Sequence, residues 1–130
     1  GVGQENQFLV PKVVNSFKAR RKSISLGNIE PFREFNDVEV ICGFYEKLLR
    51  AVVSSEIINI CTGMVHSVKE ILECMEYISG MRMEVNIDER FVRKNELLEL
   101  KGDPKKLETL VGQVEGDYYL SNLLRKMYAS

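Results

Sequence analysis

The chain has 130 residues, of which 45% are hydrophobic and 28% are charged, and its formal net charge is −1. This length holds one compact domain of about 100–150 residues, and the apolar content excludes an intrinsically disordered chain. The balanced charge gives no reason to expect nucleic acid or a membrane as a partner, and no apolar run approaches the roughly 20 residues that cross a bilayer, so we expect a cytoplasmic protein.

The first half of the chain predicts two helices and two strands. Residues 8–21 have helical spacing, with Pro11 in the first turn. Ser23–Leu26 alternates and is broken by a Gly-Asn turn, which indicates a short strand. Asn36 and Glu39 have the spacing of a capping box. The helix after them is expected to be the longest, and to bury the stripe Val38, Ile41, Tyr45, Leu48, Leu49 and Val52. Residues 57–61 are β-branched and apolar, which predicts a buried strand.

The second half predicts three more helices and one strand. Ser67 and Glu70 form a second capping-box pattern, and Gly80 supplies the stop of that helix. Residues 83–87 alternate as a half-buried strand. A helix is predicted with Asp103 as N-cap and Pro104 in its first position, and the last helix is expected to start near Asp117. With about five helices and three short strands, the predicted fold class is a small α+β domain covering residues 1–130.

The cysteines and the histidine do not have the spacing of a metal site or of a reactive thiol pair. Cys42, Cys61 and Cys74 are isolated and lie in apolar segments, so we expect three buried thiols in a reducing compartment. His66 is the sole histidine and has no paired ligands nearby in sequence. No metal is therefore expected.

Neither a dinucleotide cradle nor a proton-relay pair is present. Gly1 and Gly3 form a lone GxG without a preceding strand or a third glycine. A short-chain dehydrogenase also needs a tyrosine followed four residues later by a lysine, and no tyrosine here has one. We therefore predict no catalytic and no cofactor-binding residue, and we expect the chain alone to be inactive and to bind no NAD(P). Since it begins without an initiator methionine, we interpret it as a piece of a longer protein.

Several blocks in order resemble the C-terminal part of the extended short-chain dehydrogenase/reductases, the NAD-dependent epimerase/dehydratase family. The blocks are residues 1–4 (GVGQ), 8–13 (FLVPKV), 26–38 (LGNIEPFREFNDV), 58–63 (INICTG), 93–96 (RKNE) and 102–104 (Gly-Asp-Pro). They are most similar to the GDP-mannose 4,6-dehydratase and GDP-4-keto-6-deoxymannose reductase branch. The resemblance implies a domain that clamps a nucleotide-sugar, while a Rossmann domain elsewhere in the parent holds NAD or NADP.

The resemblance also implies a set of substrate-binding residues. Arg33 and Arg93 match arginines that grip the pyrophosphate, for which paired guanidinium hydrogen bonds are suited. Lys12 matches a lysine near phosphate or ribose, Asn28 an amide for the nucleobase, and Glu96 an acceptor for ribose hydroxyls. Val10 and Leu26 are expected to pack on the base plane.

Each of these residues has a structural alternative. Arg33 and Arg93 could form surface salt bridges to the nearby Glu34 or Glu89, and Lys12 could be a solvated helix residue. Asn28 could simply suit its turn, Glu96 could be an exposed carboxylate at the start of a helix, and the apolar pair could be plain core. The chain also departs from the family at three positions: Glu34 replaces an aspartate, Lys94 a proline and Val40 an acidic residue.

Three functions follow for the parent protein. The first is an NAD(P)-dependent dehydratase, epimerase or reductase of a nucleotide-sugar, with a GDP-sugar favoured. The second is a UDP- or dTDP-sugar enzyme of the same superfamily, and the third is a non-catalytic binding module. As partners we expect the nucleotide-sugar, the parent's own Rossmann domain and, for the full-length protein, further copies of itself.

Overall fold

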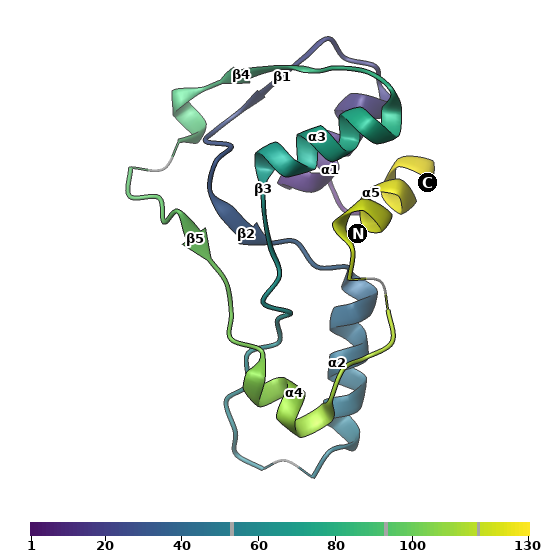
Figure 1. The fold of residues 1–130 in the computed structure, drawn as a ribbon, viewed down its shortest axis with the longest axis vertical. Coiled ribbons are helices and arrows are strands. Elements are labelled where there is room, and N and C mark those ends of the chain that lie inside the picture. Colours follow the sequence, from purple (N-terminus) through teal and green to yellow (C-terminus); the bar gives the residue numbers. More distant parts are fainter. Residues whose placement is uncertain (53, 93, 117) are drawn as a thin grey trace.

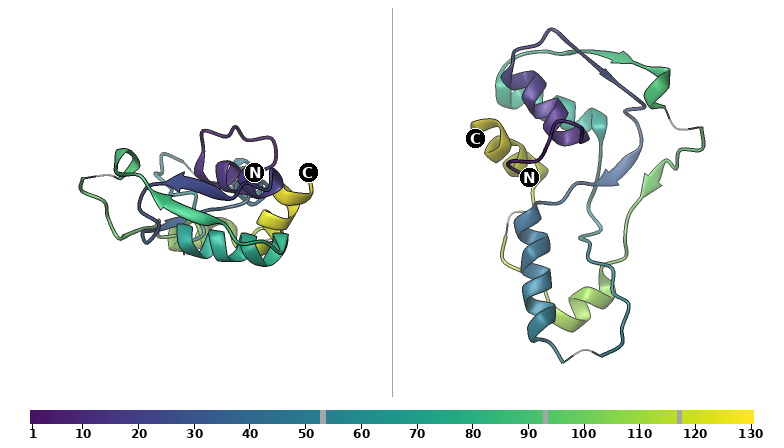
Figure 2. Two further views of the ribbon diagram at one scale, coloured as in Figure 1. Left: turned by 90° about the horizontal axis from the view of Figure 1, so that it is seen from above. Right: turned by 180° about the vertical axis from the view of Figure 1, so that it is seen from behind.

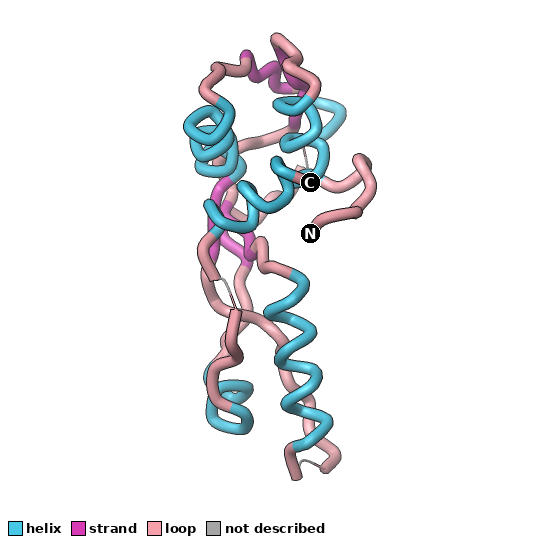
Figure 3. Tube along the Cα trace, turned by 90° about the vertical axis from the view of Figure 1, so that its right-hand side faces the viewer, coloured by secondary structure: helices cyan, strands magenta, loops and turns pink. Residues whose placement is uncertain are grey.

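Two hydrophobic cores of unequal size divide the molecule into an upper and a lower lobe (Figures 1 and 3). The computed structural model describes residues 1–52, 54–92, 94–116 and 118–130. The larger core belongs to the upper lobe and is built mainly from α1 (Leu9–Lys18), α3 (Val68–Ser79), α5 (Leu120–Ala129) and a pair of strands. The smaller core lies between α2 (Val38–Arg50) and α4 (Lys105–Val111) in the lower lobe.

The three helices of the upper lobe pack against one another, as the view from behind in Figure 2 shows. Phe17 on α1, Ile71 and Met75 on α3, and Leu124 on α5 are all fully buried. Burial of such side chains stabilises a fold by about 1.5–3 kcal/mol each. The three helices predicted for these parts of the chain are confirmed in α1, α3 and α5, and α5 buries Leu120, Leu123, Leu124 and Met127. The expected start near Asp117 falls outside the described residues.

Both ends of α3 have the structure that their sequences predict. The Ser67 hydroxyl accepts a hydrogen bond from Glu70 N at 3.1 Å, and the Glu70 carboxylate accepts one from Ser67 N at 3.0 Å. Gly80 ends the helix with φ of 68°, a left-handed conformation that glycine adopts without a Cβ penalty. Both the capping box and the glycine stop are therefore confirmed.

A parallel strand pair crosses the upper lobe. β1 (Ser23–Leu26) pairs with β4 (Glu84–Ile87), with Ile24 opposite Val85. Both strands were predicted. Met83 is buried but Ile87 is 54% exposed, so only the first part of the expected apolar face of the 83–87 segment reaches the core. After β4 the chain forms a 3₁₀ turn, η1 (Glu89–Phe91).

A second, mixed sheet connects the lobes. β2 (Phe32–Glu34) lies between β3 (Val65–Ser67), to which it is antiparallel, and β5 (Glu99–Leu100), to which it is parallel. These strands have three, three and two residues, too few for an alternating pattern to be recognised. The α+β class and the five helices are confirmed, but the described residues form five strands instead of the three expected.

Glu34 joins three segments where the lobes meet. One of its carboxylate oxygens accepts a hydrogen bond from Gly102 N at 2.6 Å, and the other accepts bonds from Thr62 N at 3.0 Å and Asn36 Nδ2 at 3.1 Å. Burial by itself raises the pKa of Glu34, but the bonds from Gly102, Asn36 and Thr62 outweigh it and hold the pKa below its usual 4.5. The carboxylate is therefore charged and bonded at neutral pH.

The predicted cap and buried face of α2 were wrong. Asp37 caps the helix by accepting a bond from Glu39 N at 3.0 Å, while Asn36 binds Glu34 and Thr62 instead. Val40 and Phe44 are the buried residues of α2. The expected stripe is largely exposed, at 52% for Val38, 56% for Tyr45, 88% for Leu49 and 107% for Val52. The helix is apolar on two faces, so spacing alone could not choose between them.

The predicted buried strand at residues 57–61 is also wrong. This segment has no strand assignment, and Ile57 is 89% exposed. A strand needs a neighbour to satisfy its backbone groups, and no strand of the described chain pairs with it. Lys106 Nζ instead donates to Ile57 O at 2.8 Å.

The remaining expectations have mixed outcomes. α4 begins at Lys105, one residue later than predicted, with Pro104 in the cap position; the Asp103 carboxylate nevertheless accepts a bond from Lys105 N at 3.0 Å. Of the three cysteines expected to be buried, Cys61 is buried, Cys74 is half-buried and Cys42 is exposed. Among the described helices, none is long and apolar enough to cross a membrane.

Candidate functional site

A pocket of about 550 Å³ lies where the upper lobe meets the mixed sheet. We call it the Arg33 pocket. Its walls come from α1, the end of β1, the turn after it, β2, the start of α3, η1 and β5. The lining residues are Gln7, Leu9, Lys12, Leu26, Gly27, Asn28, Pro31, Arg33, Phe35, Val68, Phe91, Glu96 and Leu100. Five of them, Lys12, Leu26, Asn28, Arg33 and Glu96, are residues that the resemblance had implied in substrate binding.

Arg33 is held by backbone and side-chain contacts within this pocket. Its Nη1 donates to Phe32 O at 2.7 Å, and its Nη2 lies 3.4 Å from Glu96 Oε1. The Arg33 and Glu96 side chains are 23% and 19% exposed, so both are shielded but reachable. The salt bridge therefore goes to Glu96 and not to Glu34, which was the alternative considered. A guanidinium has five N–H groups, so these two bonds leave further donors for an anion.

Lys12 reaches the pocket from α1. Its Nζ donates to Ser25 O at 2.7 Å and lies 4.9 Å from the centre of the Phe91 ring, a cation–π distance. Asn28 follows β1, and its side-chain oxygen accepts a bond from Glu30 N at 3.1 Å. That bond stabilises the turn and uses the oxygen, not the NH₂ group, so the turn role and a ligand role are compatible. Leu26 is 3% exposed and forms part of the floor.

Of the two further residues of the sequence-based set, only Val10 can be placed, and it does not line the Arg33 pocket. Val10 is half-buried and lines a smaller neighbouring cavity of about 340 Å³, which shares only Leu9 and Phe35 with the Arg33 pocket. Arg93 lies outside the described residues.

Phe91 and Gly27 line the pocket but were not anticipated. Phe91 ends η1, and a lone phenylalanine after a strand carries no motif. A Cβ on Gly27 would collide with the Phe91 carbonyl oxygen and lie 2.8 Å from its carbonyl carbon. The Gly-Asn turn had been noticed as a strand break, but the close approach of a segment some 60 positions later is a tertiary contact.

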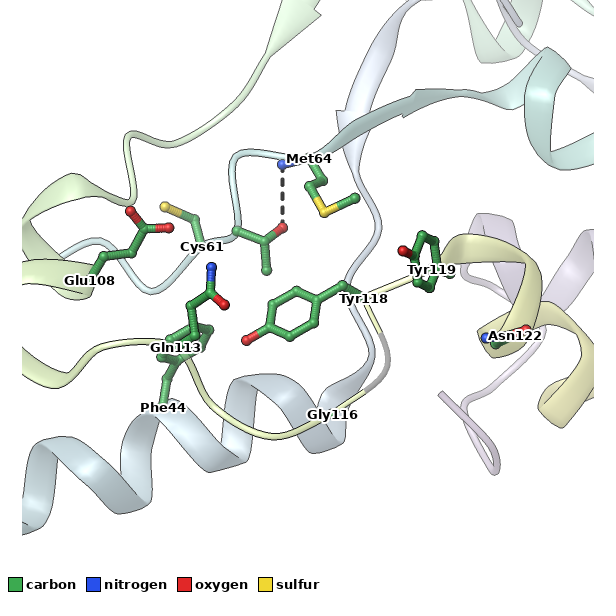
Figure 4. A pocket seen from close by; sticks show the side chains of 10 residues that line it. Phe44, Cys61, Met64, Glu108, Gln113, Gly116, Tyr118, Tyr119 and Asn122 are labelled. Carbon is green, nitrogen blue, oxygen red and sulfur yellow. Dashed lines mark hydrogen bonds between the residues drawn. The ribbon is translucent and has the colours of Figure 1, made fainter.

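A second pocket, of about 600 Å³, lies between α2, α4 and the segment before α5 (Figure 4). We call it the α2–α4 pocket. Phe44, Cys61 and Gln113 lie near the Tyr118 ring, whose hydroxyl donates to Val114 O at 3.0 Å. Glu108 is the charged side chain among its described lining residues, and no lysine or arginine is among them. The α2–α4 pocket therefore lacks the positive charge that an anionic ligand requires.

Thiol and metal chemistry have little support in either pocket. Burial, together with the carboxylates of Glu34 and Asp103, raises the pKa of Cys61, so the thiol stays protonated and is a poor nucleophile. His66 Nδ1 lies 3.3 Å from Glu70 Oε2, on β3 beside Arg33 in the sheet register. Within the described residues, no group of three or more potential metal ligands comes together.

Comparison with known proteins gives consistent relatives, although no protein-family model matches the chain. The chain is 37% identical over 131 residues to GDP-6-deoxy-D-talose 4-dehydrogenase of Aggregatibacter actinomycetemcomitans, covering 98% of this chain and 44% of that protein. A candidate epimerase from Burkholderia cenocepacia J2315 matches in structure with a TM-score of 0.93 and 37% identity, over 100% of this chain and 44% of that one. The structure of RMD from Pseudomonas aeruginosa complexed with NADPH has a TM-score of 0.89 at 21% identity, over 99% and 44% of the two chains.

The chain matches the C-terminal part of an epimerase/dehydratase-type short-chain dehydrogenase/reductase. The resemblance drawn from the sequence blocks is thereby confirmed. The chain spans less than half the length of the relatives it matches.

Proposed function

We propose that this chain is the substrate-binding part of an NAD(P)-dependent nucleotide-sugar enzyme, and that the Arg33 pocket holds the nucleotide diphosphate. The observation that carries the proposal is convergence: five residues that the resemblance implied, from α1, from β1 and the turn after it, from β2 and from the segment before β5, line one cavity. Small-molecule sites are concave, largely apolar and contain a few convergent polar groups, which fits this pocket.

The polar groups of the pocket suit the parts of a nucleotide diphosphate. The Arg33 guanidinium offers paired donors for two phosphate oxygens, and the Lys12 ammonium offers a mobile point charge. Glu96 is an acceptor for ribose hydroxyls, and the Asn28 amide for a base edge. Because Glu96 contacts Arg33 in this structure, we expect a bound diphosphate to compete for the guanidinium and release the carboxylate toward the ribose.

The name of the 37% identical relative favours GDP over UDP or dTDP, and an oxidation or reduction at position 4 of a 6-deoxyhexose. We therefore propose a GDP-sugar as the substrate of the parent enzyme. The RMD structure, complexed with NADPH, supports a nicotinamide cofactor in the parent.

The residues described here do not fit that cofactor. A dinucleotide cradle runs from a strand through a glycine-rich turn into a helix. The strand–glycine–helix connection found here is β5, Gly102 and α4, with one glycine. Gly102 N already donates to Glu34, and Asp103 adds a negative charge where a pyrophosphate would need a positive one. The cofactor is accordingly assigned to another part of the parent.

The lower lobe has exposed apolar residues that another domain could cover. The outer face of α2 exposes Val38, Tyr45 and Leu49, and Ile57 is 89% exposed at the start of the segment 57–61, which has no strand neighbour in the described chain. Exposed apolar patches of this kind mark interaction surfaces, and an unpaired β-branched segment is suited to a sheet edge. We propose that the parent's Rossmann domain covers this face.

Titration of the 130-residue chain with GDP and with NADPH tests the proposed function. We expect saturable GDP binding with a Kd of about 0.1–1 mM, equivalent to about 4–5.5 kcal/mol, because only part of the parent's site is present. NADPH is expected not to compete with GDP. Ligand-observed NMR suits this affinity range. Saturable NADPH binding at micromolar concentration would overturn the assignment. So would the absence of GDP binding at a concentration ten times the upper end of the expected Kd range.

A further inference from the structure

Phe91 is an exposed aromatic ring fixed in the wall of the Arg33 pocket. Its side chain is 55% exposed although it lines the cavity. The turn that carries it is anchored, because Asp88 N donates to Leu26 O at 2.8 Å and the Asp88 carboxylate accepts from Arg90 N at 3.0 Å. The Arg90 side chain also donates to both oxygens of Asp88. A single turn held in this way presents the ring without ordering cost on binding.

The backbone carbonyl group of Phe91 lies against the turn that contains Asn28. Gly27 permits this approach, since any Cβ there would collide with the Phe91 carbonyl. Phe91 is therefore held beside Gly27, the residue before Asn28, although 64 positions separate Phe91 from Gly27 in the chain. A ring face and an amide are thus brought to the same end of the pocket.

Two cationic side chains lie near the Phe91 ring at cation–π distances. Lys12 Nζ lies 4.9 Å and the Arg90 guanidinium carbon 6.0 Å from its centre. A ring that is half exposed, lies in a concave polar site and has a cation beside it offers a surface on which a planar heteroaromatic ring stacks. Stacking of a nucleobase on an aromatic side chain is worth about 1–3 kcal/mol and tolerates any base.

We propose that Phe91 is the stacking platform for the nucleobase of the bound nucleotide. This inference rests on the proposed function of the Arg33 pocket. Phe91 contributes affinity without discriminating among bases, and the choice of base is left to polar contacts at its edge, such as those of Asn28. The diphosphate then lies on the side of Arg33.

The test compares GDP with inorganic pyrophosphate, which has the charge but no base. Phe91→Ala is expected to weaken GDP binding about tenfold, and UDP binding similarly, while pyrophosphate affinity stays within about twofold of wild type. Phe91→Trp should retain GDP binding. Phe91→Leu keeps an apolar side chain but no π face, and should lose affinity like the alanine variant. Tyr77→Ala is the matched control, since Tyr77 is 80% exposed with Arg125 at 5.7 Å from its ring, outside the pocket.

The outcomes separate this inference from the function beneath it. If Phe91→Ala and Phe91→Leu bind GDP as the wild type does, while Arg33→Ala does not, the platform role is wrong and the pocket assignment stands. Equal losses for GDP and pyrophosphate would also overturn it, because Phe91 would then act only by holding Lys12 or the turn. If the wild-type chain binds neither compound, the proposed function fails and this inference fails with it.

Discussion

Replacing Arg33 with alanine is expected to abolish measurable GDP binding by this chain. The guanidinium lies in the pocket wall with a side chain only 23% exposed. Loss of a charge-assisted, two-point contact in a partly desolvated cleft costs about 2–5 kcal/mol, which is a factor of about 30 to several thousand in Kd. In the full-length parent the same change should weaken nucleotide-sugar binding by that factor and leave NAD(P) affinity nearly unchanged.

Related variants compare how much each positively charged side chain contributes to GDP affinity. Arg33→Lys should restore part of the affinity, because an ammonium keeps the charge without the planar fork. Lys12→Ala should cost less, because water and salt partly replace a flexible charge. The resemblance gives Arg93 the same role as Arg33, so Arg93→Ala carries the same expectation. Lys22→Ala, which removes one exposed charge outside the pocket, is the control for net charge. Unchanged GDP affinity in Arg33→Ala, with Lys22→Ala behaving alike, would refute the diphosphate site.

Replacing Glu34 should give the second large effect, on stability. Glu34→Ala leaves the backbone N–H groups of Gly102 and Thr62 without their acceptor, and each unsatisfied, partly buried donor costs about 1–3 kcal/mol. We expect the free energy of unfolding to fall by about 2–4 kcal/mol. Glu34→Gln should cost less, because one amide oxygen still accepts a bond.

The effect of Glu34 has a defined pH dependence. Its pKa is lowered on folding, so its contribution is complete above the unfolded value near 4.5 and disappears as the pH falls through the lower folded value. The difference between wild type and Glu34→Gln should therefore be largest at neutral pH and shrink below about pH 4.5. Urea denaturation followed by circular dichroism from pH 3 to 8 measures it. Glu73→Gln, on the exposed side of α3, is the control. A pH-independent difference between wild type and Glu34→Gln would contradict the stabilising role of the Glu34 carboxylate.

Features set by neighbouring residues in the chain were predictable. The capping box of Ser67 and Glu70 and the glycine stop at Gly80 lie within one helix and need no tertiary information. The strand Ser23–Leu26 was found with its bounds because alternation and a Gly-Asn break act together. The resemblance added the polar pocket residues, which no periodicity identifies.

Features that depend on a distant or absent neighbour were not predictable. The buried face of α2 is chosen by Leu107 on α4, and the helix alone has two apolar faces. Residues 57–61 have strand composition but find no partner strand in the described chain. Phe91 reaches the pocket only because Gly27 lacks a side chain, a contact that neither residue signals by itself.

Mapping the GDP-binding residues by NMR tests whether the Arg33 pocket holds the nucleotide diphosphate. The amide signals of the ¹⁵N-labelled chain would be followed through a GDP titration. We expect saturable shifts at residues 26–28, Arg33, Phe91 and Glu96, with Cys61 and Tyr118 in the α2–α4 pocket unaffected. Saturable shifts confined to the α2–α4 pocket, or no saturable shifts at all, would contradict the assignment of the Arg33 pocket to a nucleotide diphosphate.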